Sequence, residues 1–258
     1  MGYAGNVFAL TAGLFVGILL CFLAGRRAAI RFATAHGEKG TTGSDPTMAA
    51  VFGLLGLLLA LTFYGAAERM DHRRALIVDE ANAIGTAYLR LDLLPSDLQP
   101  EIRESFRQYL DSRLEFYKSV KDSDRNLQID QTSRLREQIW TKAVSASRAS
   151  GSHEDAGKLL LPALNAMFDI ATTRLAALHM HPPTIIFVML FGFALISSVL
   201  AGGSLTPTNR INRINVLAFA AVMAIAVYVI LDLEYPRLGL IRVDAFDRFL
   251  IGVRTMMH

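Results

Sequence analysis

A charged motif rich in small residues occupies positions 79–90 and reads DEANAIGTAYLR. Its alanines and glycine allow a second helix to approach closely, so we expect Glu80 and Asn82 to be partly buried. A buried carboxylate needs a cationic or hydrogen-bonding partner, such as Arg90 or a basic residue on another helix. The chemistry that this motif favours is ion pairing at a helix junction.

A second charged motif, at 232–244, reads DLEYPRLGLIRVD and leads into a short amphipathic helix. We expect this C-terminal segment to pack on the helix formed by residues 69–90, with Asp232 or Glu234 pairing to one of three arginines there. Those possible partners are Arg69, Arg73 and Arg74. The candidate junction or gating residues of the two motifs are Glu80, Asn82, Arg90, Asp232, Glu234 and Arg237. Structural ion pairing without a gating role is the alternative.

The patterns of common catalytic sites are missing from the chain. It has no P-loop, GxGxxG, GxSxG or HExxH motif, and its single cysteine, Cys21, lies in an apolar run. His179 and His181 form an HxH at a helix end, where exposed imidazoles are favoured over a metal site. We therefore expect no enzyme, no catalytic residues, no metal and no cofactor.

Four apolar runs explain where the charged motifs lie. They cover residues 7–25, 48–67, 184–203 and 214–231 and contain no acid, base or histidine. Each has about the length that crosses a bilayer as a helix, roughly 17–25 residues.

Hydrophobic residues make up 52% of the chain and charged residues 19%, which is too polar for a chain wholly embedded in lipid. A net charge of +3 without a basic stripe argues against a nucleic-acid partner.

The stretch between the second and third runs has helical periodicity and no strand pattern. The second run should continue as one helix to Leu94, and three amphipathic helices should follow at about 98–121, 127–148 and 156–179. The last of these has a possible later start near Pro162. The predicted fold is all-α, with four transmembrane helices and a helical extramembrane domain inserted between spans two and three. The expected domains are 1–67, 68–183, 184–231 and a C-terminal amphipathic segment, 232–258.

The connection at 26–47 should be a polar loop, rich in glycine and threonine at 37–43. Arg26, Arg27 and Arg31 favour a cytoplasmic position for it, and Arg210 and Arg213 in the third connection agree. Arginines also follow the second and fourth runs, so the side of the helical insert stays open. Gly13 with Gly17, and Gly56 with Ala60, have the spacing of close helix contacts, although such pairs also occur by chance.

The runs EANAIGTAYLRLDLLP and DLEYPRLGLIRVD resemble the bacterial bestrophin-like proteins, over nearly the whole chain. Bestrophins are pentameric anion channels with four spans per subunit and a helical cytoplasmic domain, and their second span lines the pore. The resemblance therefore implies that the corresponding stretch here, 51–64, lines a pore. Its candidate pore-lining residues are Phe52, Leu59, Thr62, Phe63 and Tyr64. In bestrophins, acidic residues after the fourth span form a calcium clasp. In this chain, the acidic residues after the fourth apolar run are separated from one another along the sequence.

We accordingly expect a homo-oligomeric ion channel, a pentamer by resemblance, in the bacterial inner membrane. Its partners would be the lipid bilayer and a permeant inorganic ion, whose charge stays open because acids and bases flank both junctions. The alternative is a non-conducting membrane sensor or scaffold that acts through its helical extramembrane bundle. No output module is visible in the chain, so a partner protein would have to supply the output.

Overall fold

A computed structural model describes residues 3–36, 46–118, 122–204, 213–235 and 237–257, and these residues are almost entirely helical. The elements are α1 (Tyr3–His36), α2 (Pro46–Leu89), η1 (Arg90–Leu93), α3 (Gln99–Lys118), α4 (Asp122–Ser147), α5 (Ala156–His179), α6 (Thr184–Gly203), α7 (Arg213–Glu234), η2 (Asp244–Phe246) and α8 (Asp247–Met256). The described residues include four helical segments long and apolar enough to cross a membrane, which contain α1, α2, α6 and α7. The predicted all-α fold with four apolar helices is confirmed.

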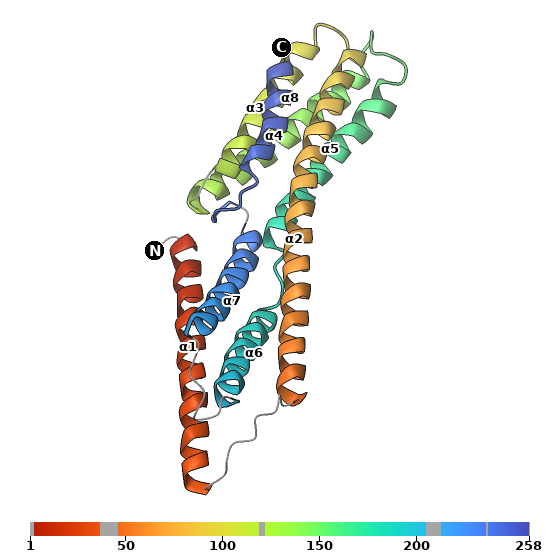
Figure 1. The fold of residues 1–258 in the computed structure, drawn as a ribbon. Coiled ribbons are helices and arrows are strands. Elements are labelled where there is room, and N and C mark those ends of the chain that lie inside the picture. Colours follow the sequence, from red (N-terminus) through yellow and green to blue (C-terminus); the bar gives the residue numbers. More distant parts are fainter. Residues whose placement is uncertain (1–2, 37–45, 119–121, 205–212, 236, 258) are drawn as a thin grey trace. The chain divides into compact units, whose positions relative to one another are not determined.

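The chain divides into two compact units, which are described separately. The first comprises Met1–Met70 and His181–Arg242, and the second comprises Asp71–Met180 and Val243–His258. The division falls inside α2, which is one unbroken helix (Figure 1). The segment 232–258 is divided between the units after Arg242.

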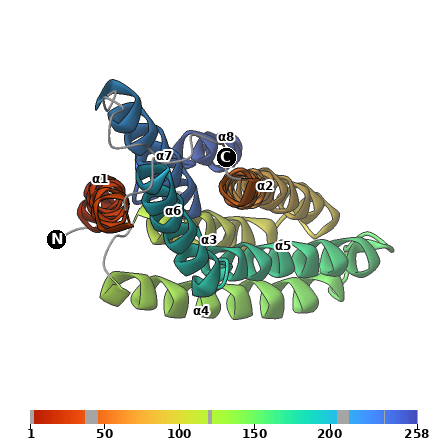
Figure 2. The same ribbon diagram turned by 60° about the horizontal axis from the view of Figure 1, so that its bottom comes forward.

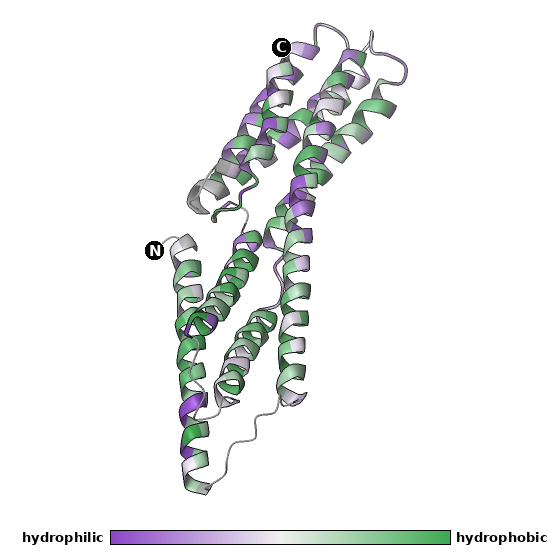
Figure 3. Ribbon diagram, in the orientation of Figure 1, coloured by the Kyte–Doolittle hydropathy of each residue, from purple (hydrophilic) through white to green (hydrophobic). Residues whose placement is uncertain are grey.

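The first unit is built on α1, which packs against both α6 and α7 (Figure 1). Its helices are hydrophobic over most of their length (Figure 3). Glycines set the approach of α1 to α6: a Cβ on Gly202 would overlap the carbonyl oxygen of Phe22, and one on Gly25 would overlap that of Val199. Helix association in lipid depends on such backbone proximity because no hydrophobic effect drives it there.

Two expectations for this unit need correction or refinement. The predicted loop at 26–47 is wrong for its first part, since α1 continues to His36. No glycine or proline falls between Arg26 and His36, so nothing ends the helix at the basic residues. Residues 37–43 and Arg210 lie outside the described residues. Of the predicted close-contact glycines, Gly17 meets Leu195 of α6, whereas Gly13 and Gly56 have open space beside them.

The second unit holds the amphipathic helices α3, α4, α5 and α8 (Figures 1 and 2). The apolar stripe of α3 is buried, with Phe106 and Leu110 fully enclosed. Tyr109 contacts Phe168 of α5 edge to face, with ring centroids 6.1 Å apart. Helix α5 begins at Ala156, so the alternative start near Pro162 is wrong and Pro162 lies inside the helix.

Candidate functional site

Helix α2 is the least covered of the four apolar segments. Only 11% of its most apolar stretch is buried, against 28% for each of the other three. Within the first unit its exposed side carries Leu54, Leu57, Leu61 and Tyr64 at three- and four-residue spacing. This side of α2 must therefore meet lipid, water or another chain.

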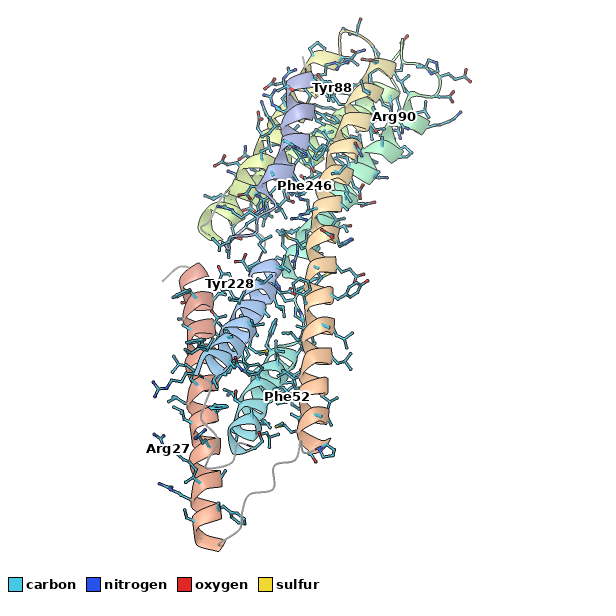
Figure 4. The ribbon with its side chains drawn as sticks, in the orientation of Figure 1. Arg27, Phe52, Tyr88, Arg90, Tyr228 and Phe246 are labelled. Atoms are coloured by element: carbon cyan, nitrogen blue, oxygen red, sulfur yellow. The ribbon has the colours of Figure 1, made fainter. Side chains whose placement is uncertain are left out.

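The five candidate pore-lining residues lie on different sides of α2. Phe63 and Tyr64 are 46% and 65% exposed. Phe52 instead contacts Phe219 of α7 edge to face, with centroids 5.8 Å apart (Figure 4). Thr62 is buried and its hydroxyl donates to the carbonyl of Leu58, while Leu59 is half-buried. Only Phe63 and Tyr64 are therefore well exposed within the single chain.

A buried carboxylate cluster lies at the end of α7 in the first unit. Glu234 is 1% exposed and accepts hydrogen bonds from Arg69, whose Nε lies 3.0 Å from Oε1. The Nδ1 atom of His181 lies 3.6 Å from Oε2 of the same carboxylate. The His181 ring is stacked on Tyr235, with centroids 4.5 Å apart. Glu234 thus links α7 to α2 and to His181, which lies just before α6. The expected pairing of Glu234 with Arg69 is present.

Asp232, the alternative to Glu234 in the predicted arginine pair, binds backbone groups instead. Its carboxylate accepts the backbone N–H groups of Leu240 and Ile241 at 3.0 and 2.7 Å, so it holds the turn that follows α7. Gly239 lies against this carboxylate, and a Cβ there would overlap it. Arg237, which belongs to the same turn, is half-buried.

The other two arginines proposed as partners have their own contacts in the second unit. Arg73 is buried and donates to the carbonyls of Ala177 and Met180 at 3.1 and 2.8 Å. Arg74 donates to Asp71 on the same helix at 3.0 Å. Among the three arginines on α2, Arg69 is the partner of Glu234 in the structure.

Replacing Glu234 with alanine should destabilise the first unit, because it leaves Arg69 without its acceptor. Arg69 is 30% exposed, so we expect a loss of roughly 1–3 kcal/mol, between the values for exposed and buried pairs. Thermal unfolding of the detergent-solubilised protein would measure it, with the exposed Glu154→Ala variant as a matched control. The exchange Arg69→Glu with Glu234→Arg should restore part of the loss. Unchanged stability in Glu234→Ala would show that the cluster does not hold this unit.

A second buried carboxylate, Glu80, lies in the core of the second unit. It is 0% exposed and its two oxygens accept from different helices: Arg113 of α3, at 2.6 Å, and Arg174 of α5. Both guanidinium groups lie over the Tyr117 ring, and Arg113 also donates to the Tyr117 hydroxyl at 2.6 Å. Burial by itself raises the pKa of Glu80, but the two arginine charges outweigh it and hold the pKa below its ordinary value.

Asn82 and Arg90 do not take part in this cluster. Asn82 is exposed, so the prediction that it is partly buried is wrong for the single chain. Two residues shift a helical side chain by about 200°, which places Asn82 on the opposite side of α2 from Glu80. Arg90, labelled in Figure 4, donates to the carbonyl of Leu159 on α5 instead of to Glu80.

The C-terminal elements η2 and α8 pack within the second unit through ion pairs and a cation–π contact. Arg254 donates to both carboxylate oxygens of Asp111 on α3, at 2.8 and 3.0 Å. Arg174 reaches Asp247 at 3.4 Å, and Arg74 of α2 lies 5.5 Å from the centroid of Phe246, which is labelled in Figure 4. The C-terminal segment therefore packs on α3 as well as on α2, whereas only α2 was predicted.

Sequence reasoning missed the two arginines that complete the Glu80 cluster. Arg113 and Arg174 are 5% and 4% exposed. A usable signal exists: each falls on the apolar side of its helix, Arg113 next to Leu110 and Tyr117 in the periodic pattern of α3. An arginine within an apolar stripe predicts a buried acidic partner.

The described residues contain no group of three or more His, Cys, Asp or Glu side chains able to hold a metal ion.

Comparisons with known proteins agree with this architecture. The family model of the Bestrophin-like domain matches residues 12–245. Among solved structures, two point-mutant forms of a bacterial bestrophin homologue from Klebsiella pneumoniae are similar in fold. One is 13% identical, with a TM-score of 0.70 over 94% of this chain and 99% of that chain. The other is 14% identical, with a TM-score of 0.67 over 95% and 98%. No curated protein sequence matches significantly. Because the family model covers most of its length, this chain belongs to the bestrophin-like family.

Proposed function

We propose that this chain forms a homo-oligomeric ion channel of the bacterial inner membrane, with α2 lining the conduction path, and that it is not an enzyme. The observation that carries the proposal is the exposed side of α2, the least buried of the four apolar segments. Membership of the bestrophin-like family supports it, because the resemblance implies channels in which the second span lines the pore.

The geometry of a single chain argues for an assembly. One helix per subunit encloses a path only when several subunits surround an axis, so a channel of this kind requires an oligomer. The exposed side of α2 has small residues, Gly53, Gly56 and Ala60, beside the leucines of the exposed stripe. Small residues let neighbouring helices approach, and leucines and aromatic residues form the hydrophobic constrictions by which channels gate. Five subunits are proposed by resemblance to bestrophins.

Reconstitution tests this proposal directly. The purified full-length protein should form a ring in detergent, with a native mass of about five chains, and should conduct ions in liposomes. A monomer without flux would contradict the proposal. A stoichiometric protein partner that co-purifies in the absence of flux would instead support the sensor or scaffold function.

The exposed charges of α2 favour cations in such a pore. Glu68 in the first unit and Asp79 in the second are both exposed acids of α2. Of the nearby arginines, Arg69 is paired with Glu234 and Arg74 with Asp71, so a carboxylate balances each of these two charges. Arg73 keeps its charge but is buried, with its guanidinium on backbone carbonyls. Rings of acidic side chains favour cations, whereas rings of basic side chains favour anions.

Replacing Asp79 with asparagine should therefore reduce the cation-to-anion permeability ratio, by roughly severalfold, because one charge is lost from every subunit at once. Reversal potentials measured across a salt gradient in planar bilayers would give the ratio. Glu137→Gln is a matched control, since Glu137 is an exposed acid on α4, away from α2. An unchanged ratio in Asp79→Asn, or an equal change in Glu137→Gln, would contradict the placement of this side of α2 along the path.

A further inference from the structure

The second unit contains a cavity of about 100 Å³ that is lined by residues of α3, α4 and α5 and is partly open to solvent. This volume equals the share of roughly three waters in the liquid, about 30 Å³ each, so the cavity can hold a small molecule. Its walls are mainly apolar, with a few polar groups. The residues that line it are Tyr109, Arg113, Phe116, Ile129, Thr132, Ser133, Arg136, Phe168, Ala171, Thr172 and Leu175.

Two polar side chains of the cavity lack a polar partner within the protein. Tyr109 is 1% exposed, and its hydroxyl makes no hydrogen bond to the part of the chain that the structure describes. Arg136 stands at the exposed side of the cavity, with its guanidinium 4.7 Å from the centroid of Phe168. It makes no ion pair with any described residue. Buried polar groups are nearly always satisfied, so an orphaned hydroxyl facing a cavity needs an explanation.

The remaining polar groups of the cavity are already engaged. The charge of Arg113 is balanced by Glu80. The Thr132 hydroxyl lies 2.8 Å from that of Ser112, and the Thr172 hydroxyl donates to the carbonyl of Phe168. The unused capacity of the cavity is therefore one positive charge at its exposed side and one buried hydroxyl. Burial raises the pKa of Tyr109, so this hydroxyl stays protonated and can donate.

We infer that this cavity is a binding site for a small aliphatic carboxylate. The carboxylate would accept paired hydrogen bonds from the Arg136 guanidinium and a further one from the Tyr109 hydroxyl. Its short apolar body would lie against Phe116, Ile129 and Leu175. Sites with apolar walls and a few convergent polar groups are typical of small organic ligands. A bare inorganic anion would lose its hydration against these walls without gaining contacts for its whole surface.

The single tryptophan of the chain provides a direct readout. Trp140 lies on α4 four residues after Arg136, on the same side of the helix. The full-length protein in detergent would be titrated with sodium butyrate at constant ionic strength while Trp140 fluorescence and thermal unfolding are recorded. Butyramide, which has no charge, and sodium chloride serve as ligand controls.

The variants separate binding from folding. Tyr109→Phe removes only the hydroxyl and Arg136→Gln changes an exposed residue, so both should fold. Each should weaken butyrate binding about tenfold or more, because a hydrogen bond to a charged group is lost. Arg134→Gln, an exposed neighbour outside the cavity lining, should bind like the unaltered protein. The inference is overturned if butyrate gives no saturable response, if butyramide or chloride responds equally, or if Arg136→Gln binds butyrate unchanged. The readout does not depend on ion flux, so it stands apart from the channel proposal.

Discussion

Replacing Glu80 with glutamine should lower the free energy of unfolding of the second unit by roughly 3–5 kcal/mol, the cost of removing one member of a buried ion cluster. Glutamine keeps the shape of the side chain but cannot balance Arg113 and Arg174, which both bond to the Glu80 carboxylate and are themselves buried. The two positive charges would then face each other across a site of low polarity. Chemical unfolding of the solubilised protein would measure the change.

The neighbouring Asp79→Asn variant is a matched control for stability, since Asp79 is exposed and one position away on the same helix. It should unfold like the unaltered protein. A Glu80→Gln protein as stable as this control would show that the cluster contributes nothing net. In other proteins the desolvation penalty of a buried ion pair can be as large as the attraction between its two charges.

The same cluster predicts how the stability of the second unit depends on pH. Because the folded-state pKa of Glu80 lies below its ordinary value of 4.5, its contribution is complete above that value. The contribution is lost as the pH falls below 4.5 through the folded-state pKa. Acid unfolding should accordingly be less steep in Glu80→Gln than in the unaltered protein.

Replacing Gly202 with alanine should separate α6 from α1 and disrupt the first unit. The added Cβ would overlap the backbone carbonyl of Phe22, which has no flexible end to move aside. Overpacking costs roughly 1–3 kcal/mol even where side chains can adjust, so a clash with backbone should reach or exceed that range. Gel filtration and thermal unfolding in detergent should show lower stability and loss of a single defined assembly.

Gly192→Ala is the matched control, because Gly192 lies on the same helix and has no atom near a new Cβ. It should leave stability and oligomer size as they are. Equal behaviour of the two variants would mean that α1 and α6 do not approach through Gly202.

The sequence by itself determined the class of this protein and the course of its helices. Runs without charge specified the apolar helices, and three- and four-residue periodicity specified the helical insert, because both depend on residues close together along the chain. Helix α5 begins and ends at the residues the sequence predicts. The sequence also narrowed the partner of Glu234 to three arginines, one of which makes the contact.

The tertiary structure alone decided which charges meet. Glu80 bonds to Arg174, 94 residues away, and not to Arg90 on its own chain segment. Asp232, the alternative to Glu234 in the predicted arginine pair, binds backbone amides instead. Gly202 was an ambiguous small-residue signal in the sequence, and only the structure shows that it lies against the carbonyl of Phe22. A periodic pattern indicates which side of a helix is apolar, but it does not indicate which distant residues pack against that side. That choice depends on the rotation and approach of whole helices, which only their packing against one another fixes.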